Sequence, residues 1–293
     1  IIEGTDMPIA QTHNEIIGSA QVKSAILLAG LNTPGKTTII EKKISRNHTE
    51  NILAQIKAGI KVKKVKGKNF ISLEGQQNLN SFNLKIPGDP SSAAFFIVLA
   101  LLTSNSKLVI KNINCNPART GFIKILKKMK ANIKIKNLKK RSGELIGDIV
   151  AKSSQLKPIK CPKKLVPLAI DEFPLLFIVA SITKGISKFA GINELRHKES
   201  DRIKNVEIGL KQIGIKTKST PDSLTIFGNP KAKATKKLKI FSKKDHRIAM
   251  SFFCLGQLLE GNVEISNFET VNTSFSKFLS TMKKIGATYE IKK

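Results

Sequence analysis

The chain has 293 residues, of which 41% are hydrophobic, so it can bury the core of one large domain or of two ordinary ones. No run of about 18 apolar residues occurs, so no membrane-spanning helix is predicted. The net charge is +30, from 51 basic and 21 acidic residues, and only six of the bases are arginines. The lysines are spread through nearly every segment and aromatic residues make up 5%, which does not favour specific nucleic-acid binding.

Three scattered cysteines match no metal-site spacing and no disulfide framework. This usage is typical of a reducing compartment, so we expect a cytoplasmic protein with no membrane association. The sequence begins Ile-Ile-Glu-Gly without a methionine, from which we expect a fragment or a processed product.

One pattern recurs along the chain: strand, helix, strand, helix, strand, strand. The first copy, at about 9–75, is expected to contain helices at 19–31 and 47–57 and strands at 37–41, 60–66 and 69–74. The second is expected to contain helices at 91–103 and 120–130 and strands at 82–86, 106–112, 131–137 and 145–152. Helix 91–103 is apolar nearly all round, which predicts a buried core helix.

The third and fourth copies complete an α/β fold with four repeats. The third is expected to contain helices at 172–183 and 199–213 and strands at 186–190, 214–219 and 223–227. The fourth is expected to contain helices at 246–260 and 273–284 and strands at 237–241, 262–267 and 286–291. The best boundary lies at 87–90, where two prolines and a glycine separate the first copy from the second.

Each first helix of a copy begins after a short polar run, and a helix N-terminus favours phosphate or carboxylate. These runs are GSAQ at 18–21, GDPSS at 88–92, AIDEFP at 169–174 and KKDHR at 243–247. Ordinary helix caps use the same residue types, so a single run would indicate no more than a cap. Four runs at equivalent places favour a shared anion-binding role.

The most charged stretch is ELRHKESDRI at 194–203, which is expected to open a helix. On that helix Lys198 and Arg202 would share a face, and Glu199 would lie one turn before Arg202. The simplest alternative is an exposed helix covered with salt bridges. A site for an anionic ligand, with an acid among the bases, is the functional interpretation.

Seven segments together resemble the 5-enolpyruvylshikimate-3-phosphate synthase family. They are SAQVKSAILLAGL (19–31), SRNHTE (45–50), GDPSSAAFF (88–96), NPARTG (116–121), IDEFP (170–174), ELRHKESDRI (194–203) and DHRIAMSF (245–252). The resemblance implies the enolpyruvyl transferase fold, with repeated βαβαββ units in two domains. It identifies 1–87 with the last unit of domain two and 88–293 with three units of domain one, four of the family's six units. Because the family's N-terminal motifs are not found here, we expect the isolated chain to be inactive.

The resemblance implies an enzyme that transfers the enolpyruvyl group of phosphoenolpyruvate to the 5-hydroxyl of shikimate-3-phosphate, in aromatic amino acid biosynthesis through chorismate. Asp171 would be the base at that hydroxyl, although a helix cap is its structural alternative. Glu199 would be the general acid that delivers and removes the C3 proton. Lys198 would hold the protonation state of Glu199 and contact the substrate.

The resemblance also implies the substrate-binding residues. Ser19, Gln21 and Ser45 would hold shikimate-3-phosphate. Arg202 and Arg247 would bind the carboxylate and phosphate of phosphoenolpyruvate, with His246 beside them as a binding or a structural residue. Two further residues stay open from the sequence: Lys23 as a phosphate contact or an exposed lysine, and Arg119 as a structural brace.

The reaction would need no metal and no organic cofactor, and the protein is expected to be a monomer. The first alternative is a transferase acting on UDP-N-acetylglucosamine with the same fold. A basic nucleic-acid-binding protein and an inactive remnant are the other two. Two departures from the family pattern, Asn47 and Ser276, lie outside the proposed chemistry but bear on the neighbouring loops.

Overall fold

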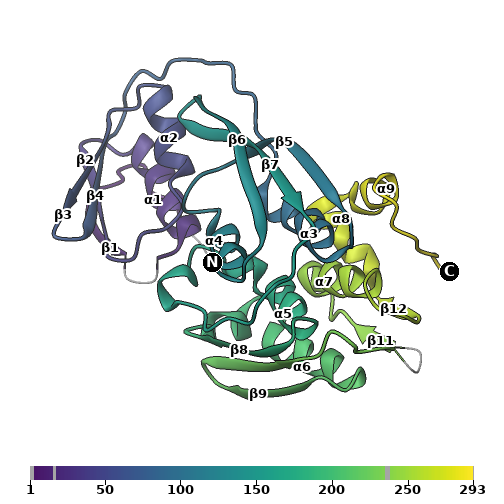
Figure 1. The fold of residues 1–293 in the computed structure, drawn as a ribbon. Coiled ribbons are helices and arrows are strands. Elements are labelled where there is room, and N and C mark those ends of the chain that lie inside the picture. The colour runs from purple at the N-terminus through teal and green to yellow at the C-terminus, as the bar shows by residue number, and fades with distance from the viewer. Residues whose placement is uncertain (1–2, 16–17, 235–237, 293) are drawn as a thin grey trace. The chain divides into compact units, whose positions relative to one another are not determined.

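The computed structural model describes residues 3–15, 18–234 and 238–292 (Figure 1). Contacts within the chain define two compact units. Unit 1 comprises Ile1–Pro87, Asn114–Ala118 and Leu138–Ile146, and unit 2 comprises Gly88–Ile113, Arg119–Asn137 and Gly147–Lys293. The first break along the chain therefore lies between Pro87 and Gly88.

Unit 1 contains one complete βαβαββ repeat. Its elements are β1 (Thr12–Glu15), α1 (Ala20–Asn32), β2 (Lys36–Glu41), α2 (His48–Gln55), β3 (Ile60–Val65) and β4 (Lys68–Glu74). The sheet order is β1-β2-β4-β3, in which β1 and β2 are parallel and the other pairs antiparallel. Alternate residues of β2 are buried, and Ile39 packs with Leu27 of α1 and Ile71 of β4 in a small apolar core. The two helices and three strands predicted for this copy are confirmed to within two residues at each end.

The second and third repeats have the same strand order without a complete first strand. The second contains α3 (Pro90–Leu102), β5 (Lys107–Asn114), α4 (Gly121–Lys128), β6 (Asn132–Arg141) and β7 (Glu144–Lys152), in the order β5-β7-β6. The third contains α5 (Phe173–Ser181), β8 (Gly185–Ala190), α6 (Arg202–Gln212), β9 (Lys216–Thr220) and β10 (Ser223–Gly228), in the order β8-β10-β9. Single parallel bridges, Gly88 with Ile113 and Lys160 with Lys188, occupy the place of the first strand.

The fourth repeat is shorter in the part of the chain that the structure describes. It contains β11 (Leu238–Phe241), α7 (His246–Gly256), β12 (Val263–Ser266), α8 (Asn272–Phe275) and α9 (Phe278–Lys284), with β11 parallel to β12. The strand predicted from 237 starts at a residue outside the described ranges. The helix predicted at 246–260 ends at Gly256, and the helix predicted at 273–284 is interrupted at Ser276 and Lys277.

Two predicted strands, 82–86 and 286–291, are wrong. Neither segment contains a strand in the described part of the chain. Phe82, Leu84 and Ile86 alternate with polar residues, as do Tyr289 and Ile291, but all five side chains are exposed. The alternation is therefore present without a neighbouring strand, and an extended segment needs such a neighbour to bond its backbone.

The core of unit 2 is built around two helices that are apolar all round. Ala93–Leu101 of α3 and the whole of α5 are buried, which confirms the predicted core helix at 91–103. Phe278 of α9 contacts the rings of Phe95, Phe96 and Phe253 in this core. Within the described residues, no helix is both long and apolar enough to cross a bilayer.

Candidate active site

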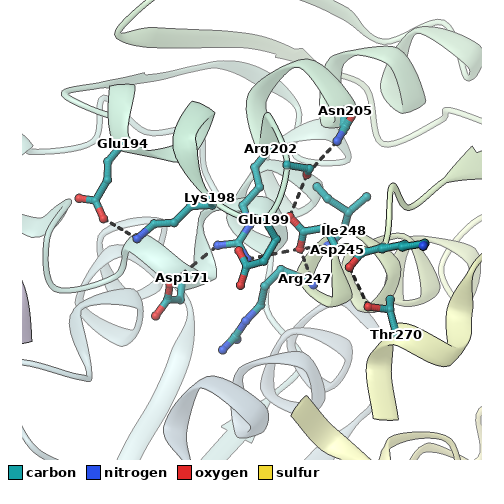
Figure 2. A network of polar contacts seen from close by, with 12 residues as sticks. Asp171, Glu194, Lys198, Glu199, Arg202, Asn205, Asp245, Arg247, Ile248 and Thr270 are labelled. Carbon is teal, nitrogen blue, oxygen red and sulfur yellow. Dashed lines mark hydrogen bonds and ion pairs between the residues drawn. The ribbon is translucent and has the colours of Figure 1, made fainter. Parts of the chain in front are cut away.

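Arg202 is the centre of a polar network in unit 2 (Figure 2). Its side chain is 1% exposed, and its Nε and Nη2 atoms donate to the carboxylate of Asp245 at 2.9 and 3.3 Å. Nη2 also donates to Glu199 Oε2 at 2.5 Å, and Nη1 lies 3.8 Å from Asp171 Oδ1. One buried guanidinium thus brings three carboxylates together, two of which are the predicted acid and base.

The stretch 194–203 is not one helix. A 3₁₀ helix, Asn193–His197, ends at Lys198, whose backbone is extended, and α6 begins only at Arg202. Asp201 is the N-cap of α6 and accepts a hydrogen bond from Lys204 N at 2.9 Å. The predicted start at 199 and the shared helix face of Lys198 and Arg202 are therefore wrong, because Asp201 caps the helix at that point.

Lys198 and Glu199 point to different partners. Lys198 Nζ pairs with Glu194, four residues earlier, whereas Glu199 pairs with Arg202. The side chain of Glu199 is 47% exposed, so solvent and ligands reach its carboxylate. In this structure the cation that contacts Glu199 is Arg202, not the adjacent lysine.

Asp245, which the sequence did not single out, fixes both Arg202 and the start of α7. It is 0% exposed and accepts from the backbone N–H groups of Arg247 at 2.9 Å and Ile248 at 3.4 Å, and from Ser200 Oγ at 2.9 Å. A buried carboxylate that accepts this many hydrogen bonds holds the groups that donate to it in fixed positions. The one sequence feature that marks Asp245 is its place in the DHR segment at 245–247, and an aspartate there is equally typical of an ordinary helix cap.

The guanidinium of Arg247 has no carboxylate partner within the described residues and extends away from the Arg202 network in Figure 2. Burial raises the pKa of Glu172, and the charge of Arg247 opposes that rise. Arg247 also adds to the effect of Arg119, which lowers the pKa of Asp89 against the effect of burial. Beside it, burial holds the pKa of His246 below its ordinary value, and the positive charge of Arg247 adds to this effect. Arg247 is therefore an arginine with its donors open to an anion.

Ser19 and Gln21 lie at the start of α1 in unit 1. Ser19 caps the helix, since its Oγ accepts from Val22 N at 3.3 Å. Its own N–H donates to Glu15 Oε1 at 3.2 Å, and Gly18 N donates to Oε2 of the same carboxylate at 2.7 Å. The backbone N–H of Ser19 is thus bonded to Glu15 and not open to a ligand, whereas Gln21 is exposed.

Ser45 and Lys23 belong to a buried cluster of unit 1. The hydroxyl and backbone N–H of Ser45 donate to Glu41 Oε1 at 2.6 and 2.8 Å. Lys23 is 1% exposed and pairs with Glu41 at 3.0 Å and Glu50 at 2.6 Å. Of the two alternatives left open for Lys23, the exposed lysine is therefore wrong, because Lys23 lies buried between two carboxylates.

Another buried carboxylate of unit 1, Glu144, is surrounded by amide side chains. It lies 2.8 Å from His48 Nδ1 and accepts from Asn51 at 2.9 Å and Asn114 at 3.0 Å. Burial alone would raise the pKa of Glu144, but these contacts lower it to about 2. Asn47, one of the two departures from the family pattern, adds an amide contact here, since its Oδ1 accepts from Asn116 at 2.7 Å.

The predicted site residues thus form two sets. Asp171, Lys198, Glu199, Arg202, His246 and Arg247 lie in unit 2, and Ser19, Gln21 and Ser45 lie in unit 1. Within the described residues, no group of three or more His, Cys, Asp or Glu side chains is arranged to hold a metal ion.

Comparison with known proteins gives relatives over nearly the whole chain. The EPSP synthase (3-phosphoshikimate 1-carboxyvinyltransferase) family model matches residues 7–282. The 3-phosphoshikimate 1-carboxyvinyltransferase of Chelativorans sp. is 42% identical over 275 residues, covering 94% of this chain and 61% of its own length. That of Magnetococcus marinus is 41% identical over 289 residues, covering 99% of this chain and 64% of its own length.

Solved structures agree with this result. EPSP synthase from Acinetobacter baumannii superposes with a TM-score of 0.87 at 42% identity, covering 98% of this chain and 65% of that one. The enolpyruvyl transferase NikO from Streptomyces tendae gives a TM-score of 0.73 at 14% identity, over 97% of this chain and 65% of that one, and shows the enolpyruvyl transferase fold alone. The chain spans about three-fifths of the length of the curated relatives it matches. The family model, the relatives and the fold agree that the chain belongs to the EPSP synthase family.

Proposed function

We propose that this chain takes part in transferring the enolpyruvyl group of phosphoenolpyruvate to the 5-hydroxyl of shikimate-3-phosphate, with release of phosphate. The observation that carries the proposal is the pairing of Asp171 and Glu199 with one buried guanidinium, that of Arg202. An addition–elimination reaction needs a base at the hydroxyl and an acid at the methylene carbon. The names of the curated relatives support the same reaction.

In the proposed chemistry, the oxygen of the 5-hydroxyl forms a bond to C2 of phosphoenolpyruvate, and Asp171 takes the proton of that hydroxyl. Glu199 protonates C3 in the same step. When the bond from C2 to the phosphate oxygen breaks, Glu199 removes a proton from C3, and inorganic phosphate leaves with the proton that Asp171 had taken. Exposure of about half of the Glu199 side chain leaves its carboxylate accessible for this exchange.

The two arginines have different parts in this proposal. Arg247 binds the anionic groups of phosphoenolpyruvate, because its guanidinium is not engaged by a carboxylate in the described structure. The Nε and Nη2 donors of Arg202 bond to Asp245 and Glu199. Its Nη1 is buried without a hydrogen-bond partner among the described residues. We assign Nη1 to phosphoenolpyruvate, and the remaining donors of Arg202 to orienting Glu199 and Asp245.

Shikimate-3-phosphate is assigned to Ser19, Gln21 and Ser45. Because the hydroxyl of Ser45 already donates to Glu41, it would accept a hydrogen bond from the ligand. We further propose that 1–87 corresponds to the last unit of the family's second domain and 88–293 to three units of the first. The break between Pro87 and Gly88 supports this assignment.

The location and assembly of the protein are proposed on narrower grounds. Cys115, Cys161 and Cys254 are buried and form no disulfide among the described residues, which is compatible with a reducing cytoplasm. A monomer is proposed, and light scattering at several concentrations tests it. The reaction as written requires no metal and no organic cofactor.

Calorimetric titration of the chain with shikimate-3-phosphate, with and without phosphoenolpyruvate, tests the ligand assignment. We expect binding of shikimate-3-phosphate that weakens about tenfold in Ser45→Ala, the loss of one or two hydrogen bonds. Glu260→Gln, at a side chain that is 77% exposed, is the matched control and should bind like the wild type. Tight binding of UDP-N-acetylglucosamine with no binding of shikimate-3-phosphate would instead favour the alternative transferase.

A further inference from the structure

Glu172 is a buried carboxyl beside Asp171 that the proposed chemistry leaves unused. It ends the 3₁₀ helix Ile170–Glu172 and is the N-cap of α5, yet its side chain makes no capping hydrogen bond. The residue is 4% exposed, and its Oε1 atom is buried without a hydrogen-bond partner among the described residues. Helix capping therefore does not explain a carboxyl in this position, which is costly to bury in its ionised form.

Ser91 links Glu172 to the start of α3. Arg119 Nη2 donates to Ser91 Oγ at 2.9 Å and also pairs with Asp89. Because the Ser91 oxygen accepts from Arg119, its hydroxyl hydrogen is left to form the hydrogen bond with Glu172. This relay holds one oxygen of Glu172 and leaves Oε1 free to carry a proton.

The surrounding charges decide which carboxyl of the pair is ionised. Burial raises the pKa of Glu172 and outweighs the opposing effects of Arg247, Ser91 and Arg119, while the charge of Asp171 raises it further. Asp171 is more exposed and has Arg202 Nη1 at 3.8 Å. Two neighbouring carboxyls in unequal surroundings divide into one neutral and one charged group.

We propose that Glu172 is a positioning residue that acts as a neutral carboxyl, so that the negative charge of the carboxyl pair stays on Asp171 and the positive charge of Arg247 stays available to an anionic ligand. The inference rests on the proposed function, because it assigns phosphoenolpyruvate to Arg247. An ionised Glu172 would oppose both effects, since it would add a negative charge within reach of Arg247 and Asp171. Anion binding at Arg247 should therefore weaken as pH rises through the titration of Glu172.

Infrared difference spectra of the chain and of Glu172→Gln at pH 7 test the charge state directly. We expect the wild type to show a carboxylic-acid carbonyl band that the variant lacks. Glu260→Gln, the exposed control, should remove an ionised-carboxylate band instead. In the wild type alone, the acid band should disappear as pH rises, which needs no variant. A band that disappears in the ordinary range of glutamate would overturn the proposal.

Phosphoenolpyruvate titrations with shikimate-3-phosphate present, carried out across pH, test the positioning role. The wild-type affinity should fall about tenfold where the acid band disappears, the effect of about one pKa unit of coupling. Glu172→Gln should keep its affinity through that range, which a merely structural role would not produce. The same fall in the variant would refute the role. A wild type that binds neither ligand would refute the proposed function and the positioning role with it, and the spectra would then report only the charge state.

Discussion

At the scale of single residues, burial separates the carboxylates that hold the structure from those that face a ligand. Asp245 and Glu199 share the guanidinium of Arg202, but Asp245 is 0% exposed and the Glu199 side chain 47%. Breaking a buried pair leaves a charge uncompensated, whereas an exposed pair contributes little. We expect Asp245→Asn to lower the free energy of unfolding by about 3–5 kcal/mol and Glu199→Gln by less than about 1 kcal/mol. Urea unfolding measures both, and equal losses would contradict the assignment.

Glu199→Gln should affect chemistry far more than stability. The amide cannot deliver or remove a proton, so turnover should fall by about 10²-fold or more while ligand affinity changes little. Turnover is measured as phosphate release by the product of the complete open reading frame. Glu260→Gln is again the control. A similar loss of turnover in both variants would remove the acid role from Glu199.

Glu144 makes the stability of unit 1 depend on acid pH. Its pKa of about 2 in the folded chain lies below the ordinary value of 4.5, so it stabilises the fold fully above 4.5 and loses this contribution as pH falls towards 2. Glu144→Gln should therefore cost about 2 kcal/mol at pH 7 and almost nothing near pH 2. Denaturant unfolding at several pH values measures this. If the unfolding free energies of the wild type and of Glu144→Gln differ by the same amount down to pH 2, the proposed cause is excluded.

At the scale of elements, α6 tests how a cap positions the site. Asp201 accepts from Lys204 N at 2.9 Å and pairs with Arg196 at 2.8 Å. We expect Asp201→Ala to cost about 1 kcal/mol, the ordinary value of an N-cap, and Asp201→Asn less, because asparagine keeps the cap acceptor. Both variants are compared by thermal unfolding. Identical losses would mean that the ion pair with Arg196, not the cap, carries the effect.

Periodicity predicted most elements, and the exceptions have physical causes. Helix 91–103 was predictable as a core helix because it is apolar nearly all round, and eleven of the thirteen residues in α3 are in fact buried. The strands at 82–86 and 286–291 were not, because an alternating pattern does not reveal whether a partner strand exists. The start of α6 was misplaced by three residues because Glu199 and Ser200 fit a helix as well as they fit the turn before it.

The candidate site was predictable to the extent that its residues lie in segments that resemble the EPSP synthase family. Asp171, Glu199 and Arg202 were placed together by those motifs, and the structure places all three on one network. The burial of Lys23 was not predictable, because nothing in its neighbourhood along the chain shows that Glu41 and Glu50 surround it. Long-range pairs of this kind arise only from packing, and so a single sequence does not reveal them.

At the scale of the whole molecule, the two units have cores of very different size. The buried apolar cluster of unit 1 consists of Leu27, Ile39, Leu53, Ala58, Ile71 and Leu73, whereas that of unit 2 extends through every one of its helices from α3 to α7 and into α9. Because apolar burial contributes about 25 cal/mol per Å², the smaller cluster provides far less of the free energy that holds a unit folded. Unit 1 also contains the buried charges of Lys23, Glu41 and Glu50, whose desolvation offsets part of that gain.

Unit 1 should therefore open at a lower free energy than unit 2. In native-state hydrogen exchange, we expect the amides of β2 and β4 to exchange through an opening that leaves α5 protected, with free energies that differ by at least about 2 kcal/mol. The experiment follows Ile39 and Ile71 in unit 1 and Phe177 in unit 2, all of which are fully buried, so local exposure does not bias the comparison. Glu144→Gln should lower protection at Ile39 and Ile71 without changing Phe177. Equal free energies at the three amides would show instead that the chain unfolds as one cooperative body.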